Sequence, residues 1–137
     1  MRIERATSID EIVQCLPLEQ EIRDKGRDTT KVSDMLFSIK GMIDNPMFGF
    51  WIAYDDKDSI IGYIAMMIVL LPGMKRLNLI RMYAKQKEVF QAFEEIGRDF
   101  AKQYGIKKVM ITVMKNVKAM QRLHGMKVVS VNMEKEL

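Results

Sequence analysis

The pattern of apolar and polar positions is clearest in the second half of the chain, between Glu88 and Tyr104. Apolar side chains recur there at helical spacing: Val89, Ala92, Phe93, Ile96 and Phe100. This spacing places them on one side of an α-helix. Gly105 follows directly and can take the left-handed conformation that ends many helices. We therefore predict a long amphipathic helix over residues 88–104.

The first third of the chain is predicted to be mostly helical. The predicted elements are a strand from Arg2 to Ala6 and helices from Ile9, from Leu18 to Lys25 and from about Lys31 to Ile43. Ser8 can cap the first helix while Glu11 reaches back to it. Pro17 has no amide hydrogen and should kink or end that helix. Three helical pieces therefore precede the second strand.

Two β-rich runs follow, Phe48–Tyr54 and Ser59–Leu71, and they flank a polar turn at residues 55–58. Such a turn between two strand-like runs predicts a hairpin. A second turn at Pro72-Gly73 precedes the alternating run Lys75–Tyr83. The three strands should form an antiparallel meander.

The last third alternates strand, helix and strand. The predicted elements are a strand from Ile106 to Met114, a short helix from Val117 to His124 and a strand from Met126 to Met133. The alternation of strand, helix and strand in this half of the chain favours a parallel pairing before the chain returns. At 137 residues we expect one α+β domain spanning residues 1–137.

This order of elements resembles that of the GNAT superfamily of N-acetyltransferases. Supporting local patterns are Trp51-Ile52-Ala53-Tyr54-Asp55-Asp56, Ile61-Gly62-Tyr63, Asn116-Val117-Lys118-Ala119 and Gly125-Met126. The resemblance implies an α/β (α+β) fold, with a mixed central sheet of about six strands that includes the meander and is flanked by four or five helices. It also implies binding of acetyl-CoA or another acyl-CoA, with Asn116 beside the pantetheine arm.

The sequence departs from the family at the phosphate-binding loop. Family members that bind acetyl-CoA have Arg or Gln, two residues, Gly, one residue, and Gly or Ala. The nearest alignment here runs from Gln86 to Gln91 and puts Val89 and Gln91 at the small-residue positions. Their side chains are expected to crowd a pyrophosphate that binds amides at a helix N-terminus. Glu88 should repel it, whereas Lys85 and Lys87 should attract it.

On this resemblance, the candidate cofactor-binding residues are Met82, Tyr83, Ala84, Lys85, Gln86, Lys87, Val89 and Asn116. No metal site is expected.

The candidate catalytic groups are also unusual. The family commonly has a tyrosine that protonates the leaving thiolate a few residues before a Gly-Phe pair, but here Leu123-His124 precede Gly125-Met126. His124 is the candidate acid, with the alternative of a helix-end residue. Glu88, Tyr83 and Tyr63 are candidate bases. Each has a structural alternative, as a first-turn helix residue or a strand aromatic.

Composition narrows the environment of the protein. The net charge of +4 is modest, and the single cysteine, Cys15, fits a reducing compartment as a small buried residue. The N-terminus lacks a signal-peptide pattern, so we expect a cytoplasmic protein. The apolar run from Tyr63 to Pro72 is shorter than the roughly 20 residues of a membrane-spanning helix. Most of the 13 methionines fall at core positions and should fill the interior.

Three functional hypotheses follow. The first is an acyltransferase that moves an acetyl or related group from acyl-CoA to a primary amine on a small molecule or protein. The second is a GNAT-like domain that has lost catalysis and serves in binding or assembly, for example as a virion-associated phage protein. The third is a nucleic-acid-binding module with a basic edge, for which no interleaved aromatic platform is present. A homodimer through a sheet edge is expected from the resemblance.

Overall fold

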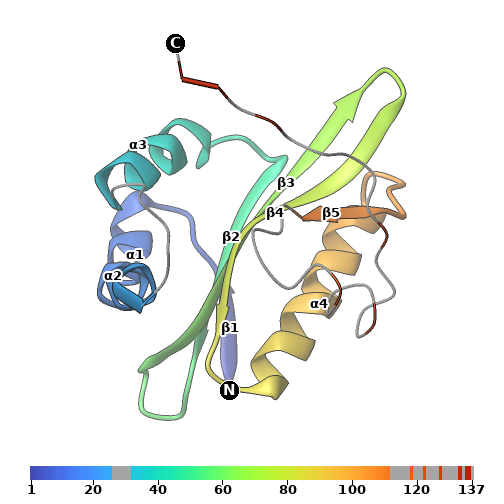
Figure 1. Ribbon diagram of the computed structural model, residues 1–137. Helices are drawn as coiled ribbons and strands as arrows, with labels where there is room; N and C mark the ends of the chain where they lie inside the picture. Colours follow the sequence, from blue (N-terminus) through green and yellow to red (C-terminus); the bar gives the residue numbers. More distant parts are fainter. Residues whose placement is uncertain are drawn as a thin grey trace.

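The computed structural model describes residues 1–25 and 32–111, together with positions 118, 122, 127, 133, 135 and 136. In chain order the elements are β1 (Arg2–Arg5), α1 (Ile9–Val13), α2 (Leu16–Lys25), α3 (Val32–Met42), β2 (Phe48–Tyr54), β3 (Ile60–Leu71), β4 (Met74–Ala84), α4 (Lys87–Lys102) and β5 (Val109–Ile111). Figure 1 shows the sheet running through the middle of the molecule.

The five described strands form one sheet in the order β1-β2-β3-β4-β5. The first three pairings are antiparallel, and β4 pairs with β5 in parallel from Leu77↔Val109 to Leu79↔Ile111. The predicted meander and the predicted parallel pairing are both confirmed. About six strands were expected and the described residues contain five; the predicted final strand and the short helix before it lie outside the described residues.

Helices cover both faces of the sheet. α1, α2 and α3 lie on one side and α4 lies on the other (Figure 1). Strand side chains alternate between the two faces, so the sheet carries two cores. The core on the α4 face includes Ile64, Met66 and Phe93. The core on the opposite face includes Phe50 and Tyr63 and is closed by the first three helices.

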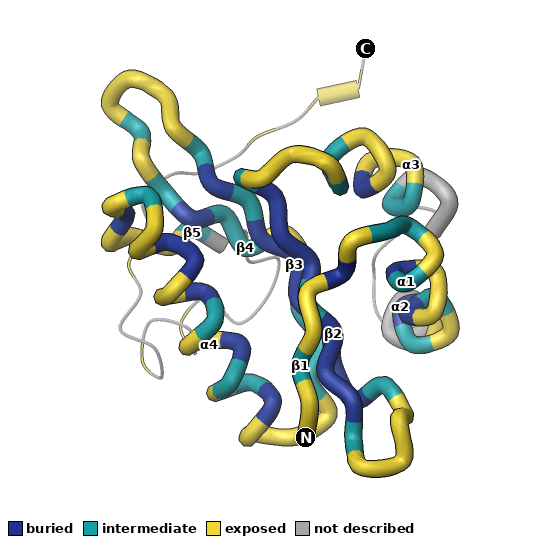
Figure 2. The backbone as a smooth tube through the Cα atoms, turned by 180° about the vertical axis from the view of Figure 1, so that it is seen from behind, coloured by how far each residue is buried: buried dark blue, intermediate teal, exposed yellow. Residues whose placement is uncertain are grey.

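The long helix predicted over residues 88–104 is confirmed as α4, which begins one residue earlier. Its buried residues lie on one side (Figure 2) and are Val89, Phe93, Gly97, Phe100 and Ala101. Gly105 has φ +69°, as expected for a glycine that ends a helix. The Ile106 amide donates to the Ala101 carbonyl at 3.0 Å and the Gly105 amide to that of Lys102 at 3.1 Å. These bonds satisfy carbonyls that the end of the helix leaves open.

The start of α1 differs from the prediction in detail. Ser8 is the N-cap residue, but its side chain makes no capping hydrogen bond. Glu11 does reach back to Ser8, since its Oε1 accepts from the Ser8 hydroxyl at 3.4 Å. The same oxygen also accepts from the Thr7 amide at 3.2 Å and the Thr7 hydroxyl at 2.9 Å. The expected capping bond from the Ser8 side chain is therefore wrong, whereas the expected contact from Glu11 to Ser8 is confirmed. Pro17 behaves as predicted, because α1 ends before it and it occupies the first turn of α2.

The turn between β2 and β3 is organised by Asp55. Its Oδ1 accepts from the amides of Lys57 at 2.8 Å and Ser59 at 2.9 Å, and Asp58 takes a left-handed conformation with φ 59°. These amide bonds lower the pKa of the Asp55 carboxyl below its ordinary value. The predicted hairpin is confirmed.

Candidate functional site

The end of β4 and the start of α4 form the candidate anion-binding junction. Only Lys85 and Gln86 connect the two elements. The Lys85 amide donates to the Ile61 carbonyl at 2.9 Å and so fastens the connection to β3. Gln86 is the N-cap residue in an extended conformation, and its side chain makes no capping bond. The first amides of α4 are left without intrahelical acceptors, at the positive end of the helix dipole.

The side chain of Val89 points away from this junction. It is fully buried in the core on the α4 face. Its neighbour across the core is Gly62, where an added Cβ would lie 2.7 Å from Val89 Cγ1. The expectation that the Val89 side chain crowds a bound pyrophosphate is therefore wrong. Helical periodicity turns this residue into the core, while Glu88 before it and Gln91 after it stay exposed.

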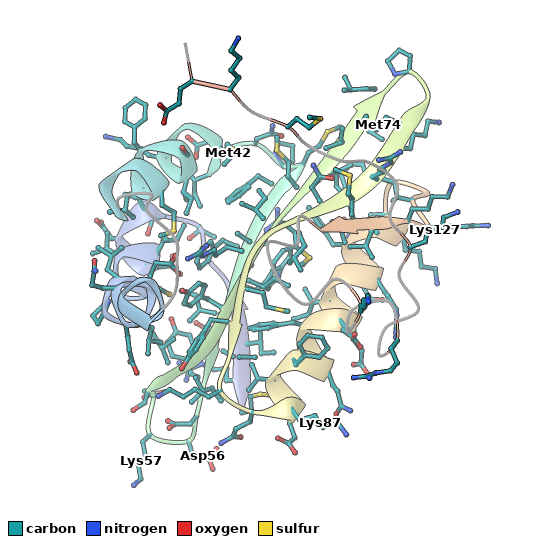
Figure 3. The ribbon with its side chains drawn as sticks, viewed as in Figure 1. Met42, Asp56, Lys57, Met74, Lys87 and Lys127 are labelled. Carbon is teal, nitrogen blue, oxygen red and sulfur yellow. The ribbon has the colours of Figure 1, made fainter. Side chains whose placement is uncertain are left out.

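The hairpin turn and the junction lie at the same end of the sheet. Figure 3 shows Asp56 and Lys57 at the β2–β3 turn and Lys87 at the start of α4 at that end. The register agrees, because Gly62, close behind the turn, pairs with Ala84. The positive charge of Lys85 contributes to the lowered pKa of Asp55.

An irregularity interrupts β4 near its end. Ala65 pairs with Arg81 and Met66 pairs with Leu79, so Ile80 has no partner in β3. This two-against-one register is that of a β-bulge. Ile80 is 45% exposed. A bulged residue is left out of the ladder with β3, and this one follows directly after Leu79, which pairs with Ile111 of β5.

A buried polar cluster joins α2 to this part of the sheet. Glu19 has no exposed surface and is the one polar or charged residue that is buried among those whose burial is described. Its Oε1 lies 2.5 Å from an Nη atom of Arg81, and its Oε2 accepts a hydrogen bond from the Tyr63 hydroxyl. Sequence reasoning missed this cluster, because Glu19 and Arg81 lie far apart in the chain and share no motif.

Tyr63 does not fit the role of a general base. Its side chain is buried, and its ring stacks on Phe50 at 5.8 Å and lies 5.9 Å from the ring of Tyr83. Burial and the hydrogen bond to Glu19 raise the pKa of the Tyr63 hydroxyl well above its ordinary value of 10. The hydroxyl therefore stays protonated and serves as a donor.

The other candidate residues divide between the two faces and the junction. Met82 and Ala84 pack against the core on the α4 face, whereas Tyr83 packs against the opposite core. The junction residues Lys85, Gln86, Lys87 and Glu88 are exposed. The structure thus brings together the stretch from Met82 to Glu88. Asn116 and His124 lie outside the described residues.

Cys15 is buried on the α1–α3 face, as predicted, with 1% of its surface exposed. Burial, assisted by the negative charge of Glu19, raises the pKa of its thiol to about 12. A thiol that stays protonated is a poor nucleophile. This residue has a packing role.

A cavity of about 440 Å³ lies on the α4 face of the sheet. Apolar side chains dominate its lining, with Met66 and Leu79 from the strands and Phe93 from α4. Within the part of the chain that the structure describes, no three His, Cys, Asp or Glu residues are grouped to hold a metal ion. No helix among the described residues is long and apolar enough to cross a membrane.

Sequence comparisons give no relatives: no family model matches the chain, and no curated protein matches it. Solved structures do match. A predicted acetyltransferase from Clostridium acetobutylicum, solved with acetyl-CoA, superposes with a TM-score of 0.74 and 14% identity, covering 98% of this chain and 95% of that one. The chain has the GNAT acetyltransferase fold.

Two further matches are aminoglycoside 6'-N-acetyltransferases. The enzyme from Acinetobacter haemolyticus has a TM-score of 0.74 at 18% identity, and the match covers 100% of this chain and 99% of that one. The enzyme from Acinetobacter baumannii has a TM-score of 0.74 at 14% identity, with coverage of 99% and 98%. At such low identity these matches establish the fold. The mixed sheet with its antiparallel meander is the GNAT arrangement that the sequence predicted.

Proposed function

We propose that this protein is a GNAT-fold N-acyltransferase that moves an acetyl or related acyl group from acyl-CoA to a primary amine. One observation carries the proposal. The inward orientation of Val89 leaves the amides at the start of α4 clear of that side chain, at the point where β4 ends. Anions bind well at such a helix N-terminus. The acetyl-CoA complex of a fold neighbour adds support.

The burial of Val89 also suggests a different alignment with the family's loop pattern. That pattern has one residue between two small ones, and a residue packed in the core suits the middle position. Val89 then stands between Glu88 and Phe90, and Lys85 takes the basic position that begins the pattern. In this register the substituted positions are Glu88, which is exposed, and Phe90, which is half-buried.

The residues at the junction suit a diphosphate in two respects and oppose it in one. Lys85 and Lys87 are exposed and positively charged, and the first-turn amides of α4 point the same way as the helix dipole. Glu88 adds a negative charge in that first turn. We propose that the amides and the two lysines outweigh this charge. Binding should therefore be weaker than in a loop with two glycines, and sensitive to salt.

Acyl transfer by direct attack of the amine needs few catalytic side chains. The amine nitrogen attacks the thioester carbonyl carbon, the C–S bond breaks, and CoA leaves as a thiolate while the amine loses a proton. An oriented amine and a donor to the carbonyl oxygen supply most of the rate. We propose a main-chain amide at the Ile80 bulge as that donor. Glu88 and Tyr83 remain the candidate bases. The family resemblance remains the basis for proposing Asn116 beside the pantetheine arm and His124 as the acid.

The acceptor is proposed to be a small-molecule or protein amine, since fold neighbours are aminoglycoside N-acetyltransferases. A cytoplasmic location and a homodimer belong to the same proposal. The alternative is a GNAT-like binding or structural protein without catalysis, for example a virion component. The observation that favours it is the exposed Glu88 carboxylate at the phosphate-binding end of α4.

Calorimetric titration with acetyl-CoA and with CoA, at low and moderate salt, tests the proposal. Micromolar binding that weakens with salt supports it, and a screen of amine acceptors for thiol release follows. No binding at millimolar ligand would overturn the acyltransferase proposal in favour of the alternative. Binding without turnover against any amine class would favour a CoA-binding protein that lacks catalysis.

A further inference from the structure

The buried carboxylate of Glu19 pairs with Arg81, next to the irregular part of β4. Glu19 comes from α2, whereas its two partners come from neighbouring strands, Tyr63 from β3 and Arg81 from β4. Glu19 and Tyr63 are 44 residues apart in the sequence, and the three residues lie in three different elements. These contacts therefore tie a helix to the sheet at one defined place.

The place of attachment is specific. Arg81 is the first residue after Ile80, the residue that has no partner in β3. Its neighbour on β3, Ala65, is fully buried, so the strand itself is anchored there, while Ile80 is 45% exposed. The ion pair with Glu19 thus fixes the strand on one side of the bulge. On the other side, Leu77 and Leu79 are fixed by pairing with β5.

A buried ion pair is a costly way to hold two elements together. Removing a carboxylate from water costs several kcal/mol, and apolar residues of similar size often stabilise a protein as well or better. Here the Glu19 side chain has no exposed surface, whereas the Arg81 side chain is 28% exposed. A requirement for precise geometry at the bulge would account for a charged pair in this position.

We propose that Glu19 is a positioning residue that sets the geometry of the β4 bulge by holding Arg81, with Tyr63 orienting its carboxylate. The inference rests on the proposed function, in which a main-chain amide at the bulge binds the oxygen of the thioester carbonyl. Glu19 touches neither acyl-CoA nor amine in this role. A displacement of about 1 Å at such a donor can lower a rate by about 100-fold.

The kinetic test uses Glu19→Gln, which keeps the shape of the side chain and removes its charge. We expect kcat to fall by about 10- to 100-fold, with less than about a twofold change in KM for acetyl-CoA. The triple variant Glu19→Met, Tyr63→Phe, Arg81→Met replaces these three polar side chains with apolar ones. It should regain stability, as other buried ion pairs do when replaced together. Its kcat should stay low, and recovery of both would show that the cluster serves stability alone.

A second measurement does not depend on activity. Hydrogen exchange, followed by NMR, should show that Glu19→Gln accelerates exchange of the protected amides between Arg81 and Ala84 by about tenfold or more. The Leu77 amide, which donates to the Lys108 carbonyl at 2.9 Å, should change only with global stability. The control variant is Ile39→Ala, which lies in the same core on α3 and has no part in the cluster. Ile39→Ala should change the exchange rates of the Arg81–Ala84 amides and of the Leu77 amide by the same factor.

The two measurements separate this inference from the proposed function. If the wild-type protein neither binds CoA nor turns over, the proposed function fails, and the exchange experiment still reports on the geometry of β4. If Glu19→Gln leaves exchange at the end of β4 unchanged relative to Ile39→Ala, the positioning role is wrong. If the wild-type protein is active and Glu19→Gln has the same kcat, the positioning role is contradicted as well.

Discussion

Gly62 and Val89 are in direct contact across the interface between β3 and α4. A Cβ at Gly62 would lie 2.7 Å from Val89 Cγ1 and 2.7 Å from the carbonyl oxygen of Tyr83. The second of these neighbours is backbone and cannot rotate away. This contact sets how closely the first turn of α4 approaches the sheet, and so where its open amides lie.

Gly62→Ala should therefore destabilise the protein and move the start of α4. Overpacking of this kind typically costs about 1–3 kcal/mol. The measurement is the free energy of unfolding from a denaturant titration. Gly41→Ala is the matched control, because an added Cβ at Gly41 in α3 meets nothing within 4 Å. That change should be neutral or stabilise by up to about 1 kcal/mol. Equal effects of the two substitutions would contradict the packing argument.

Val89→Ala should reduce stability without improving CoA binding. Because Val89 is fully buried, losing two methyl groups from the core should cost about 2 kcal/mol. The control is Gln91→Ala, at an exposed position two residues further along, which should leave stability within about 0.5 kcal/mol. Calorimetric titration of both variants with CoA tests whether the Val89 side chain affects CoA binding. A large gain in affinity from Val89→Ala would restore the idea that this side chain blocks the phosphates.

Glu88→Gln should strengthen CoA binding at low salt. Glu88 is exposed in the first turn of α4, where a negative charge stabilises the helix but opposes an anionic ligand. A change of about 0.3–1 kcal/mol corresponds to a gain of about two- to fivefold in affinity. Lys85→Gln and Lys87→Gln should each weaken binding by a similar factor. All three effects should shrink as salt is added, and an effect that persists at high salt would point to steric contact.

The Cys15 thiol should make the protein less stable at alkaline pH. Its pKa is raised from an ordinary value of 9.0 to about 12 in the folded protein. Because the folded-state pKa is the higher one, this contribution is complete below pH 9 and is lost as the pH rises from there toward 12. The slope should not exceed about 1.4 kcal/mol per pH unit.

Cys15→Ala should remove that part of the alkaline loss. The test compares the free energies of unfolding of wild type and variant between pH 8 and roughly 10.5, so that other groups cancel. A thiol reagent offers an independent check. It should label Cys15 slowly in the native protein and rapidly in denaturant, and fast labelling of the native protein would contradict its burial.

Tyr63→Phe should remove a hydrogen-bond donor from the Glu19 carboxylate and leave its ion pair with Arg81 in place. Loss of one hydrogen bond to a buried charged group typically costs about 1.5–3 kcal/mol. The raised pKa of the Tyr63 hydroxyl means that its contribution is complete below pH 10 and declines above it. Unfolding measurements at pH 7 should show the loss. Tyr83→Phe is the control, because its ring lies beside Tyr63 whereas the Tyr63 hydroxyl is the one that donates to the Glu19 carboxylate. A larger effect at Tyr83 would contradict the assignment.

Local patterns were sufficient for most of the elements. The helical spacing from Val89 to Phe100 predicted α4 to within a residue at its start, and Gly105 predicted its end. The polar turn before Ser59 and the glycine at position 73 predicted two hairpins, because turn residues act through their own backbone preferences. Pro17 predicted the break between α1 and α2 for the same reason.

The direction of individual side chains was harder to predict. Val89 was placed at the phosphate by counting residues from Gln86, but the packing of α4 on β3 turns it toward Gly62. A shift of one residue rotates a helical side chain by about 100°. The apolar spacing of the helix already indicated the correct direction of this side chain, because it grouped Val89 with Phe93 on the buried side.

The sequence by itself determined the elements, their order and the resemblance to GNAT acetyltransferases, because propensity, periodicity and turn chemistry act over a few neighbouring residues. Only the tertiary structure decided that Glu19 meets Tyr63 and Arg81, that β4 bulges at Ile80, and that Gly62 receives Val89. Each of these contacts joins elements distant in the chain. Their formation depends on sheet register and on helix packing, and no short stretch of sequence contains both partners.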